Sequence, residues 1–262
     1  MKIGIFDSGL GGLYLLKAIT EKLPKYDYVF LGDTKNLPYG DKTQKQVYKL
    51  TSKAVDFLFE QNCALVILAC NTASVEALRK IQTEYLPKKY PNRRVLGVVV
   101  PTLEVIRVGD VCVLATLATS KSKAYSRELK KLNPKSKVYE ISSPELVPLI
   151  ETHQLAKLSK AVAKYSDLIQ NKKVKNLILG CTHYALLKKD FATKLGSGIK
   201  VISQDEIIPA KLKDYLYEHE ELEQALTKKR ERKFYVTKLT KELSLSSKKW
   251  FGKKVELRLA KY

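Results

Sequence analysis

Two short segments far apart in the chain share one pattern, and this pattern constrains the fold more than any other feature. Residues 64–69 are wholly apolar and lead into Cys70, and residues 176–179 lead through Gly180 into Cys181. A segment that can start a helix follows each cysteine. In open α/β sheets, ligands bind at the carboxyl ends of the strands. The two cysteines are therefore expected to face one substrate from two half-sites.

Strands alternate with helices along the rest of the chain, which predicts an α/β fold with a parallel sheet in each half. The expected strands are residues 2–6, 28–31, 64–69, 95–100, 110–114, 137–141, 176–179, 200–202, 234–237 and 255–259. The main expected helices are residues 13–23, 43–61, 73–85, 121–132, 144–151, 155–170 and 207–217.

Three segments between these elements carry separate expectations. Residues 86–94 are basic and bounded by prolines, which predicts a surface loop. Pro101 is expected to end the strand before it, and a domain boundary fits there because the strand–helix pattern then begins again. Residues 219–233 are almost all charged, which is typical of an exposed helix end or a linker.

Length and composition favour a globular protein. A chain of 262 residues with 45% hydrophobic residues can bury a substantial core. No apolar run reaches the ~18 residues that cross a bilayer, and the N-terminus lacks the apolar core of a signal peptide. We therefore expect a cytoplasmic protein that does not enter a membrane.

The cysteines and histidines give little support for a metal site or a disulfide framework. The four cysteines lack C-x-x-C spacing, and the three histidines are scattered. The cytoplasm would also keep the thiols reduced. Cys63 and Cys112 lie beside or within strand-like runs and are expected to be small buried hydrophobic residues.

The net charge of +21 is compatible with nucleic acid or an anionic membrane as a partner. However, the lysines are spread along the whole chain, and no helix-turn-helix or RNA-binding signature accompanies them. This distribution favours solvated, lysine-rich helix faces and disfavours a nucleic-acid partner. A positive electrostatic field that attracts an anionic substrate is compatible with this distribution of lysines.

A glycine-rich turn, residues 7–12, follows the first expected strand and precedes a helix. Such a turn brings backbone N–H groups towards an anion. The dinucleotide-binding fingerprint is the obvious alternative, but its third glycine would fall at Tyr14. Asp7 also stands where phosphate would have to approach. The sequence therefore disfavours a dinucleotide site.

The cysteine pair suggests proton transfer. A cysteine close to a histidine is typical of nucleophilic catalysis, and Cys181 with His183 leaves that interpretation open, but it gives Cys70 no task. Two thiols on opposite sides of a small substrate suit removal of a proton from one face of a carbon and its return to the other. An ordinary thiol pKa of ~8.5 allows both forms, and helix N-termini with a cationic neighbour are expected to lower it. The alternative for either cysteine alone is a buried packing residue.

The polar side chains in the other turns then have natural roles. Asp7 is expected to accept from a substrate ammonium or to assist Cys70, although an aspartate at this position could also simply cap the turn. His183 is expected to assist Cys181. The neutral side chains expected to hold carboxylates and an amine are Ser8, Asn71, Thr72, Thr119 and Thr182.

Together these motifs resemble the glutamate racemases, which are cofactor-independent enzymes of the aspartate/glutamate racemase superfamily. The resemblance covers nearly the whole chain. The matching segments are residues 7–12, 32–34, 38–40, 69–73, 119–122, 146–148 with Glu151, 179–184 and 234–237. The chain departs from the family pattern at Thr102, Ala115-Thr116, Ala185 and Ser203-Gln204-Asp205.

The resemblance implies an architecture and an activity. It implies two doubly wound α/β domains related by pseudo-twofold symmetry, residues 1–97 with 205–262 and residues 98–204, with the substrate enclosed between them. It implies interconversion of L- and D-glutamate without a cofactor, a supply of D-glutamate for peptidoglycan, and a homodimer. A racemase for aspartate or another small acid remains open, as does a basic nucleic-acid or partner-binding protein that retains the fold.

The resemblance also implies roles for individual residues. Cys70 would deprotonate D-glutamate and Cys181 L-glutamate, with assistance from Asp7, Glu151 and His183. The implied substrate contacts are Asp7, Ser8, Pro38, Tyr39, Gly40, Asn71, Thr72, Thr119, Thr182 and His183.

Overall fold

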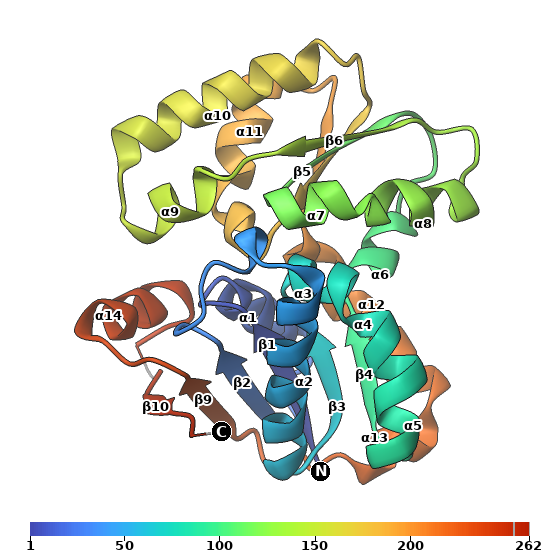
Figure 1. Ribbon diagram of the computed structural model, residues 1–262, viewed down its shortest axis with the longest axis vertical. Helices are drawn as coiled ribbons and strands as arrows, with labels where there is room; N and C mark the ends of the chain where they lie inside the picture. Colours follow the sequence, from blue (N-terminus) through green and yellow to red (C-terminus); the bar gives the residue numbers. More distant parts are fainter. Residues whose placement is uncertain (254, 262) are drawn as a thin grey trace.

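Two parallel sheets with helices packed around them make up the fold (Figure 1). The computed structural model describes residues 1–253 and 255–261. The strands are β1 (Lys2–Asp7), β2 (Tyr28–Gly32), β3 (Cys63–Leu68), β4 (Arg94–Gly97), β5 (Val111–Ala115), β6 (Val138–Ser142), β7 (Asn176–Gly180), β8 (Lys200–Ile202), β9 (Arg232–Val236) and β10 (Leu257–Leu259).

The helices connect these strands as crossovers. They are α1 (Gly12–Lys22), α2 (Gln44–Glu60), α3 (Asn71–Glu76), α4 (Leu78–Lys80), α5 (Leu86–Lys89), α6 (Val99–Leu103), α7 (Leu117–Ser122), α8 (Ala124–Leu132), α9 (Leu146–Glu151), α10 (Leu155–Gln170), α11 (Lys188–Leu195), α12 (Gln204–Glu218), α13 (Glu220–Ala225) and α14 (Lys241–Trp250). Short helical turns also occur at Tyr39–Asp41, Ile81–Tyr85 and Thr182–Leu187.

The first sheet has six strands in the order β10-β9-β2-β1-β3-β4, and the second has four in the order β6-β5-β7-β8. The predicted α/β class with parallel sheets is confirmed. The C-terminal strands β9 and β10 return to the sheet of β1 to β4, as Figure 1 shows by their red colour beside the blue strands. The exact domain limits, 1–97 with 205–262 and 98–204, stay a prediction.

Burial explains why these strands are so apolar. Every residue of β3 is buried, and so is every residue of β5 and β7. A central strand of a parallel sheet is covered on both faces, so it shows a continuous apolar run and not an alternation. Cys63 and Cys112 lie fully buried within β3 and β5, which confirms their prediction as small buried residues.

The predicted surface loop at residues 86–94 is wrong in part, because residues 86–89 form α5 and only residues 90–93 lie outside helix and strand before β4 begins. The helical turn at Ile81–Tyr85 continues into α5, and Pro87 lies in the first turn of that helix. Proline lacks the backbone N–H that a continuing helix uses, and the turn before Pro87 is widened into a π-helix. The expectation for Pro101 is also wrong: β4 already ends at Gly97, and the proline lies in the first turn of α6, where no helical hydrogen bond is lost.

The predicted exposed segment at residues 219–233 is also wrong in part. It contains α13 and the start of β9, and Leu222 and Leu226 are buried. The backbone N–H groups of Lys229 and Glu231 donate to Oδ1 of Asp27, at 3.0 and 2.8 Å. The segment is therefore fixed to the first sheet despite its high charge.

Gly32 ends β2 where the glycine-rich turn passes close by, and this predicts a stability effect. A Cβ at residue 32 would lie 2.5 Å from the carbonyl oxygen of Gly9. Gly32→Ala should therefore lower the free energy of unfolding by about 1–3 kcal/mol, because backbone must move. Denaturant unfolding measures this, with Gly198→Ala as the control because no atom lies within 4 Å of its Cβ position. Equal stability of the two variants would contradict the close packing.

Across the described part of the chain, no helix combines the length and the apolar character that crossing a membrane requires.

Candidate active site

The two cysteine turns lie at the carboxyl ends of β3 and β7, and both line one cavity of about 60 Å³. Cys70 is the N-cap residue of α3, and Cys181 precedes the helical turn at Thr182–Leu187. The two sheets therefore bring their thiols to the same small space. The other expected site residues that line this cavity are Ser8, Pro38, Tyr39, Gly40, Asn71, Thr72, Thr182 and His183.

Cys70 lies in a desolvated environment. Its thiol donates to Oγ of Ser8 at 3.3 Å, and its sulfur accepts the backbone N–H of Ala73 at 3.4 Å. Burial raises the pKa of the Cys70 thiol to about 12, and the negative charges of Asp7 and Cys181 add to this effect. The expectation that a helix N-terminus lowers the thiol pKa is therefore wrong for Cys70, because desolvation outweighs two weak hydrogen bonds.

This pKa leads to a labelling prediction. The rate at which iodoacetamide alkylates Cys70 should rise about tenfold per pH unit between about pH 7 and about pH 10, because the thiolate is the nucleophile. Mass spectrometry of the peptide that contains Cys70 measures the rate. A model cysteine peptide serves as the control, since its rate should level off above its pKa of ~8.5. A Cys70 rate that levels off with the model peptide would contradict the buried, protonated thiol.

His183 lies between Glu151 and Cys181. Its Nε2 is 2.6 Å from Oε1 of Glu151, and its Nδ1 is 3.8 Å from the sulfur of Cys181. Burial opposes the charged ring, yet the hydrogen bonds and negative charges of Cys181 and Glu151 raise the pKa of His183 well above its usual value. The arrangement therefore places an imidazolium beside one of the two sulfurs.

Trp250 covers the histidine ring from α14. The two rings meet edge to face with centroids 5.8 Å apart, and Trp250 is buried. No local motif pointed to Trp250, because α14 is about 70 positions from His183 along the chain. Only the return of the C-terminal segment to the first sheet brings it to His183.

Asp7 is a fully buried carboxylate that joins the two halves of the site. Its Oδ2 accepts the N–H groups of Gly9 and Gly12 at 3.2 and 3.1 Å, and its Oδ1 accepts the hydroxyl of Thr182 at 3.2 Å. Burial raises the pKa of Asp7, and the positive charge of His183 opposes the rise. Asp7 thus caps its own turn, which was the alternative role expected for it, and it also contacts the turn that carries Cys181.

Three threonine hydroxyls form a cluster beside the Cys70 turn. Oγ1 of Thr72 lies 3.0 Å from that of Thr116 and 3.2 Å from that of Thr119. Thr119 is buried and does not line the cavity itself, but its Oγ1 lies within hydrogen-bond distance of Thr72 and Thr116, which do line it. Gly40 packs against the same cluster, since a Cβ there would lie 2.8 Å from Cβ of Thr116.

The Tyr39 hydroxyl donates to Oδ2 of Asp33 at 2.7 Å.

The side chain of Asn71 is occupied by residues that the sequence analysis did not assign to the site. Its amide pairs with that of Gln204, and its oxygen also accepts the hydroxyl of Tyr125. The unusual Ser203-Gln204-Asp205 segment was the only signal that pointed to Gln204. Nothing in the sequence pointed to Tyr125.

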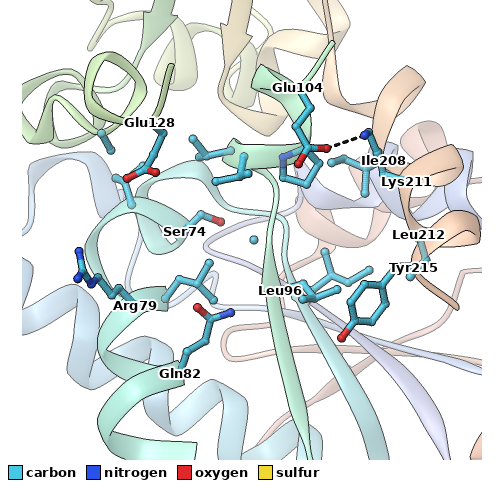
Figure 2. A pocket seen from close by; sticks show the side chains of 18 of the residues that line it. Ser74, Arg79, Gln82, Leu96, Glu104, Glu128, Ile208, Lys211, Leu212 and Tyr215 are labelled. Carbon is cyan, nitrogen blue, oxygen red and sulfur yellow. Dashed lines mark hydrogen bonds and ion pairs between the residues drawn. The ribbon is translucent and has the colours of Figure 1, made fainter. Parts of the chain in front are cut away.

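A second, larger cavity of about 760 Å³ contains neither active-site thiol (Figure 2). Ser74 and Gln82 line it from one side, and Leu212 and Tyr215 of α12 from another. Glu104 and Lys211 form an ion pair of 2.5 Å at its edge. The cavity of the cysteines, although smaller, is therefore the candidate active site.

Comparison with known proteins identifies the family of the chain. The family model described as Asp/Glu/hydantoin racemase matches residues 11–207. A glutamate racemase of Dinoroseobacter shibae is 35% identical over 98% of this chain and 98% of its own length. A crystal structure of a glutamate racemase isoform from Bacillus anthracis superposes with a TM-score of 0.89 at 26% identity, and it covers 99% of this chain and 97% of that one.

A further crystal structure, the glutamate racemase of Francisella tularensis in complex with D-glutamate, has a TM-score of 0.87 at 29% identity, with 99% and 97% of the two chains covered. The resemblance that the sequence motifs indicated is confirmed. The chain belongs to the Asp/Glu/hydantoin racemase family and, within it, groups with the glutamate racemases.

Proposed function

We propose that the protein interconverts L- and D-glutamate without a cofactor, by proton transfer between the α-carbon and two thiols. The observation that carries the proposal is the pair of sulfurs, Cys70 and Cys181, that line one cavity from two different sheets. Racemisation requires a base on one face of the carbon and an acid on the other, and two opposed thiols supply both.

The reaction needs opposite protonation states at the two sulfurs. With L-glutamate, the Cys181 thiolate takes the α-proton, and the Cys70 thiol delivers its own proton to the opposite face to give D-glutamate. The imidazolium of His183 attracts negative charge to Cys181, and the high pKa of Cys70 keeps that thiol protonated and able to donate. The return reaction runs the same transfers backwards.

The remaining polar groups bind and position the substrate. Asp7 lies close enough to Cys70 to raise its pKa, so a substrate ammonium beside Asp7 would stabilise the thiolate that D-glutamate requires. Glu151 acts through Nε2 of His183, which it holds in orientation. The residues proposed to contact the substrate are Asp7, Ser8, Pro38, Tyr39, Gly40, Asn71, Thr72, Thr119, Thr182 and His183.

The family also supports proposals about the setting of this reaction. We propose that the enzyme works in the cytoplasm as a homodimer and supplies D-glutamate for peptidoglycan. The two-domain division at residues 97 and 205 belongs to the same proposal. Its support is the sheet topology, in which strands from both ends of the chain share the six-stranded sheet.

The direct test of the substrate uses four amino acids. The protein is incubated separately with L-glutamate, D-glutamate, L-aspartate and D-aspartate, and the loss of the circular dichroism signal of the amino acid is followed. Both glutamates should reach the same racemic end point, much faster than either aspartate. Racemisation of aspartate in preference to glutamate would identify the alternative substrate. No change with any of the four would refute the proposed function.

A further inference from the structure

A buried hydrogen-bond network fixes the residue that follows Cys70. Oδ1 of Asn71 accepts the Tyr125 hydroxyl at 2.6 Å and Nε2 of Gln204 at 2.8 Å, while Nδ2 of Asn71 donates to Oε1 of Gln204 at 2.9 Å. Asn71, Tyr125 and Gln204 are 2%, 0% and 4% exposed. Both acceptor sites of the asparagine oxygen are therefore filled by groups that water cannot replace.

The three residues come from elements of different sheets. Asn71 begins α3, directly after the strand β3 of the six-stranded sheet. Tyr125 lies in the first turn of α8, which leads from β5 to β6 of the four-stranded sheet. Gln204 begins α12, just after β8 of that same sheet. The network therefore joins the Cys70 turn to the part of the chain that carries Cys181.

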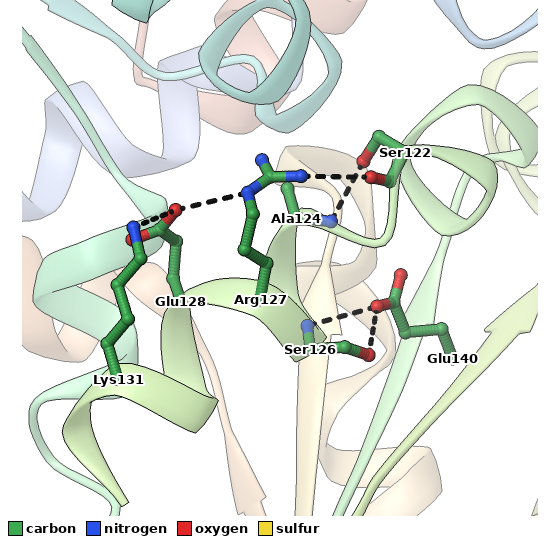
Figure 3. A network of polar contacts seen from close by, with 7 residues as sticks. All are labelled: Ser122, Ala124, Ser126, Arg127, Glu128, Lys131 and Glu140. Atoms are coloured by element: carbon green, nitrogen blue, oxygen red, sulfur yellow. Dashed lines mark hydrogen bonds and ion pairs between the residues drawn. The ribbon is translucent and has the colours of Figure 1, made fainter. Parts of the chain in front are cut away.

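Tyr125 is itself held firmly from the second sheet. Its neighbours Ala124 and Ser126 donate backbone N–H groups to Oγ of Ser122 at 3.2 Å and to Oε1 of Glu140 at 3.1 Å (Figure 3). The hydroxyl of Ser126 donates to the same Glu140 oxygen. Glu140 belongs to β6, so the tyrosine hydroxyl presents a fixed donor to Asn71.

The active site is closed in this arrangement. The cavity between the thiols, about 60 Å³, is far smaller than the ~300–1,000 Å³ of typical small-molecule sites. Cys70 is 5% exposed and Cys181 is 9% exposed. Entry of an amino acid requires walls of this cavity to separate, and separation of the Cys70 turn from the second sheet would break the Asn71 network.

We propose that Gln204 and Tyr125 are positioning residues that clamp Asn71 across the two sheets and thereby hold the Cys70 turn in the closed site. Their kinetic effect rests on the proposed function, whereas their effect on access to Cys70 does not. Loss of the clamp should favour the open form. To the extent that the open form becomes populated, substrate must supply the closure energy, which raises KM while kcat changes little.

The experiment measures alkylation of each cysteine separately by mass spectrometry after exposure to iodoacetamide. In Gln204→Ala, Cys70 should react about tenfold faster than in the wild type, because the Asn71 amide loses its partner in a buried place. KM for D-glutamate should rise by a smaller factor, because KM scales with the inverse of the closed population, which falls by less than the open population rises. Tyr125→Phe, which removes only a hydroxyl, should raise the alkylation rate by about threefold and KM by less than Gln204→Ala does.

Two internal monitors separate an opened site from a loosened fold. Cys63 and Cys112 are both 0% exposed and lie in the cores of the two sheets. Their alkylation rates should stay at the wild-type value in both variants. Matched control variants are Tyr28→Phe and Gln82→Ala, whose lost bonds run only to the backbone oxygens of Leu23 and Val95.

The outcomes distinguish the clamp from the proposed function. The clamp would be overturned if iodoacetamide alkylated Cys70 at the wild-type rate in both Gln204→Ala and Tyr125→Phe. It would also be overturned if the alkylation rates of Cys63 and Cys112 rose together with that of Cys70. Faster alkylation confined to the active-site cysteines would support it even if the wild-type protein racemised no glutamate. In that case the proposed function alone would fail.

Discussion

Replacing either active-site cysteine with serine should lower kcat/KM for glutamate racemisation by about a thousandfold or more, which is the usual size of a lost acid–base group. A hydroxyl is a far weaker acid than a thiol and does not form the required base near neutral pH. L- and D-glutamate are mirror images of equal energy, so kcat/KM must fall by the same factor in both directions for Cys70→Ser and for Cys181→Ser.

The loss of kcat/KM in each direction is measured by circular dichroism, in reactions that start from L-glutamate or from D-glutamate. Cys112→Ala is the matched control, because that thiol is buried in the core of the second sheet and does not line the active-site cavity. Its kcat/KM should stay near the wild-type value. Substantial racemisation by either serine variant would refute the assignment of two thiol bases.

Replacing His183 with asparagine should lower kcat/KM by about a hundredfold to ten-thousandfold, the range of acid–base assistance. The charged ring beside Cys181 is lost, so negative charge on that sulfur is no longer stabilised. Glu151→Gln should have a smaller effect, about tenfold, because the amide oxygen still accepts from Nε2 while its negative charge is gone.

The control for the histidine is His153→Asn. His153 is exposed, and its φ of 53° lies in the left-handed region, which asparagine adopts readily. Racemisation by that variant should match the wild type. If His183→Asn kept the wild-type kcat/KM while alkylation of Cys181 also stayed unchanged, the assistance of His183 to Cys181 would be refuted.

The fold could be predicted largely because central parallel strands show their burial directly in the sequence. The wholly apolar run that became β3 and the amphipathic period of α10 left little choice of structure. Two of the errors involved proline. Pro87 and Pro101 suggest breaks, but Pro101 lies in the first turn of α6, where it costs no hydrogen bond, and Pro87 follows a π-helical turn that continues into α5.

The site could be predicted only as far as local motifs reach. Cys70, Cys181 and His183 stand in turns whose sequence carries the chemistry. The contacts around these turns come from residues far away in the chain. Tyr125 lies 54 positions from Asn71, to which it donates, and Gln204 lies 133 positions from it. No local pattern encodes such contacts.

The thiol pKa was missed for a related reason. A helix N-terminus is visible in the sequence, but the depth at which a thiol is buried is not. Burial of Cys70 reverses the direction of the expected shift. The same burial keeps the thiol protonated in the empty site, so Cys70 holds the proton that L-glutamate must receive on its opposite face.

The most direct test of two thiols on opposite faces is the location of deuterium during the first few per cent of reaction in deuterated water. L-Glutamate with protium at the α-carbon is the substrate, and both enantiomers are separated and analysed by mass spectrometry. The account predicts D-glutamate that carries deuterium from its first appearance, because a solvent-exchanged thiol delivers it, while the remaining L-glutamate keeps protium. Deuterium entering L-glutamate as fast as D-glutamate, or D-glutamate that retains the original protium, would indicate a single base and contradict the account.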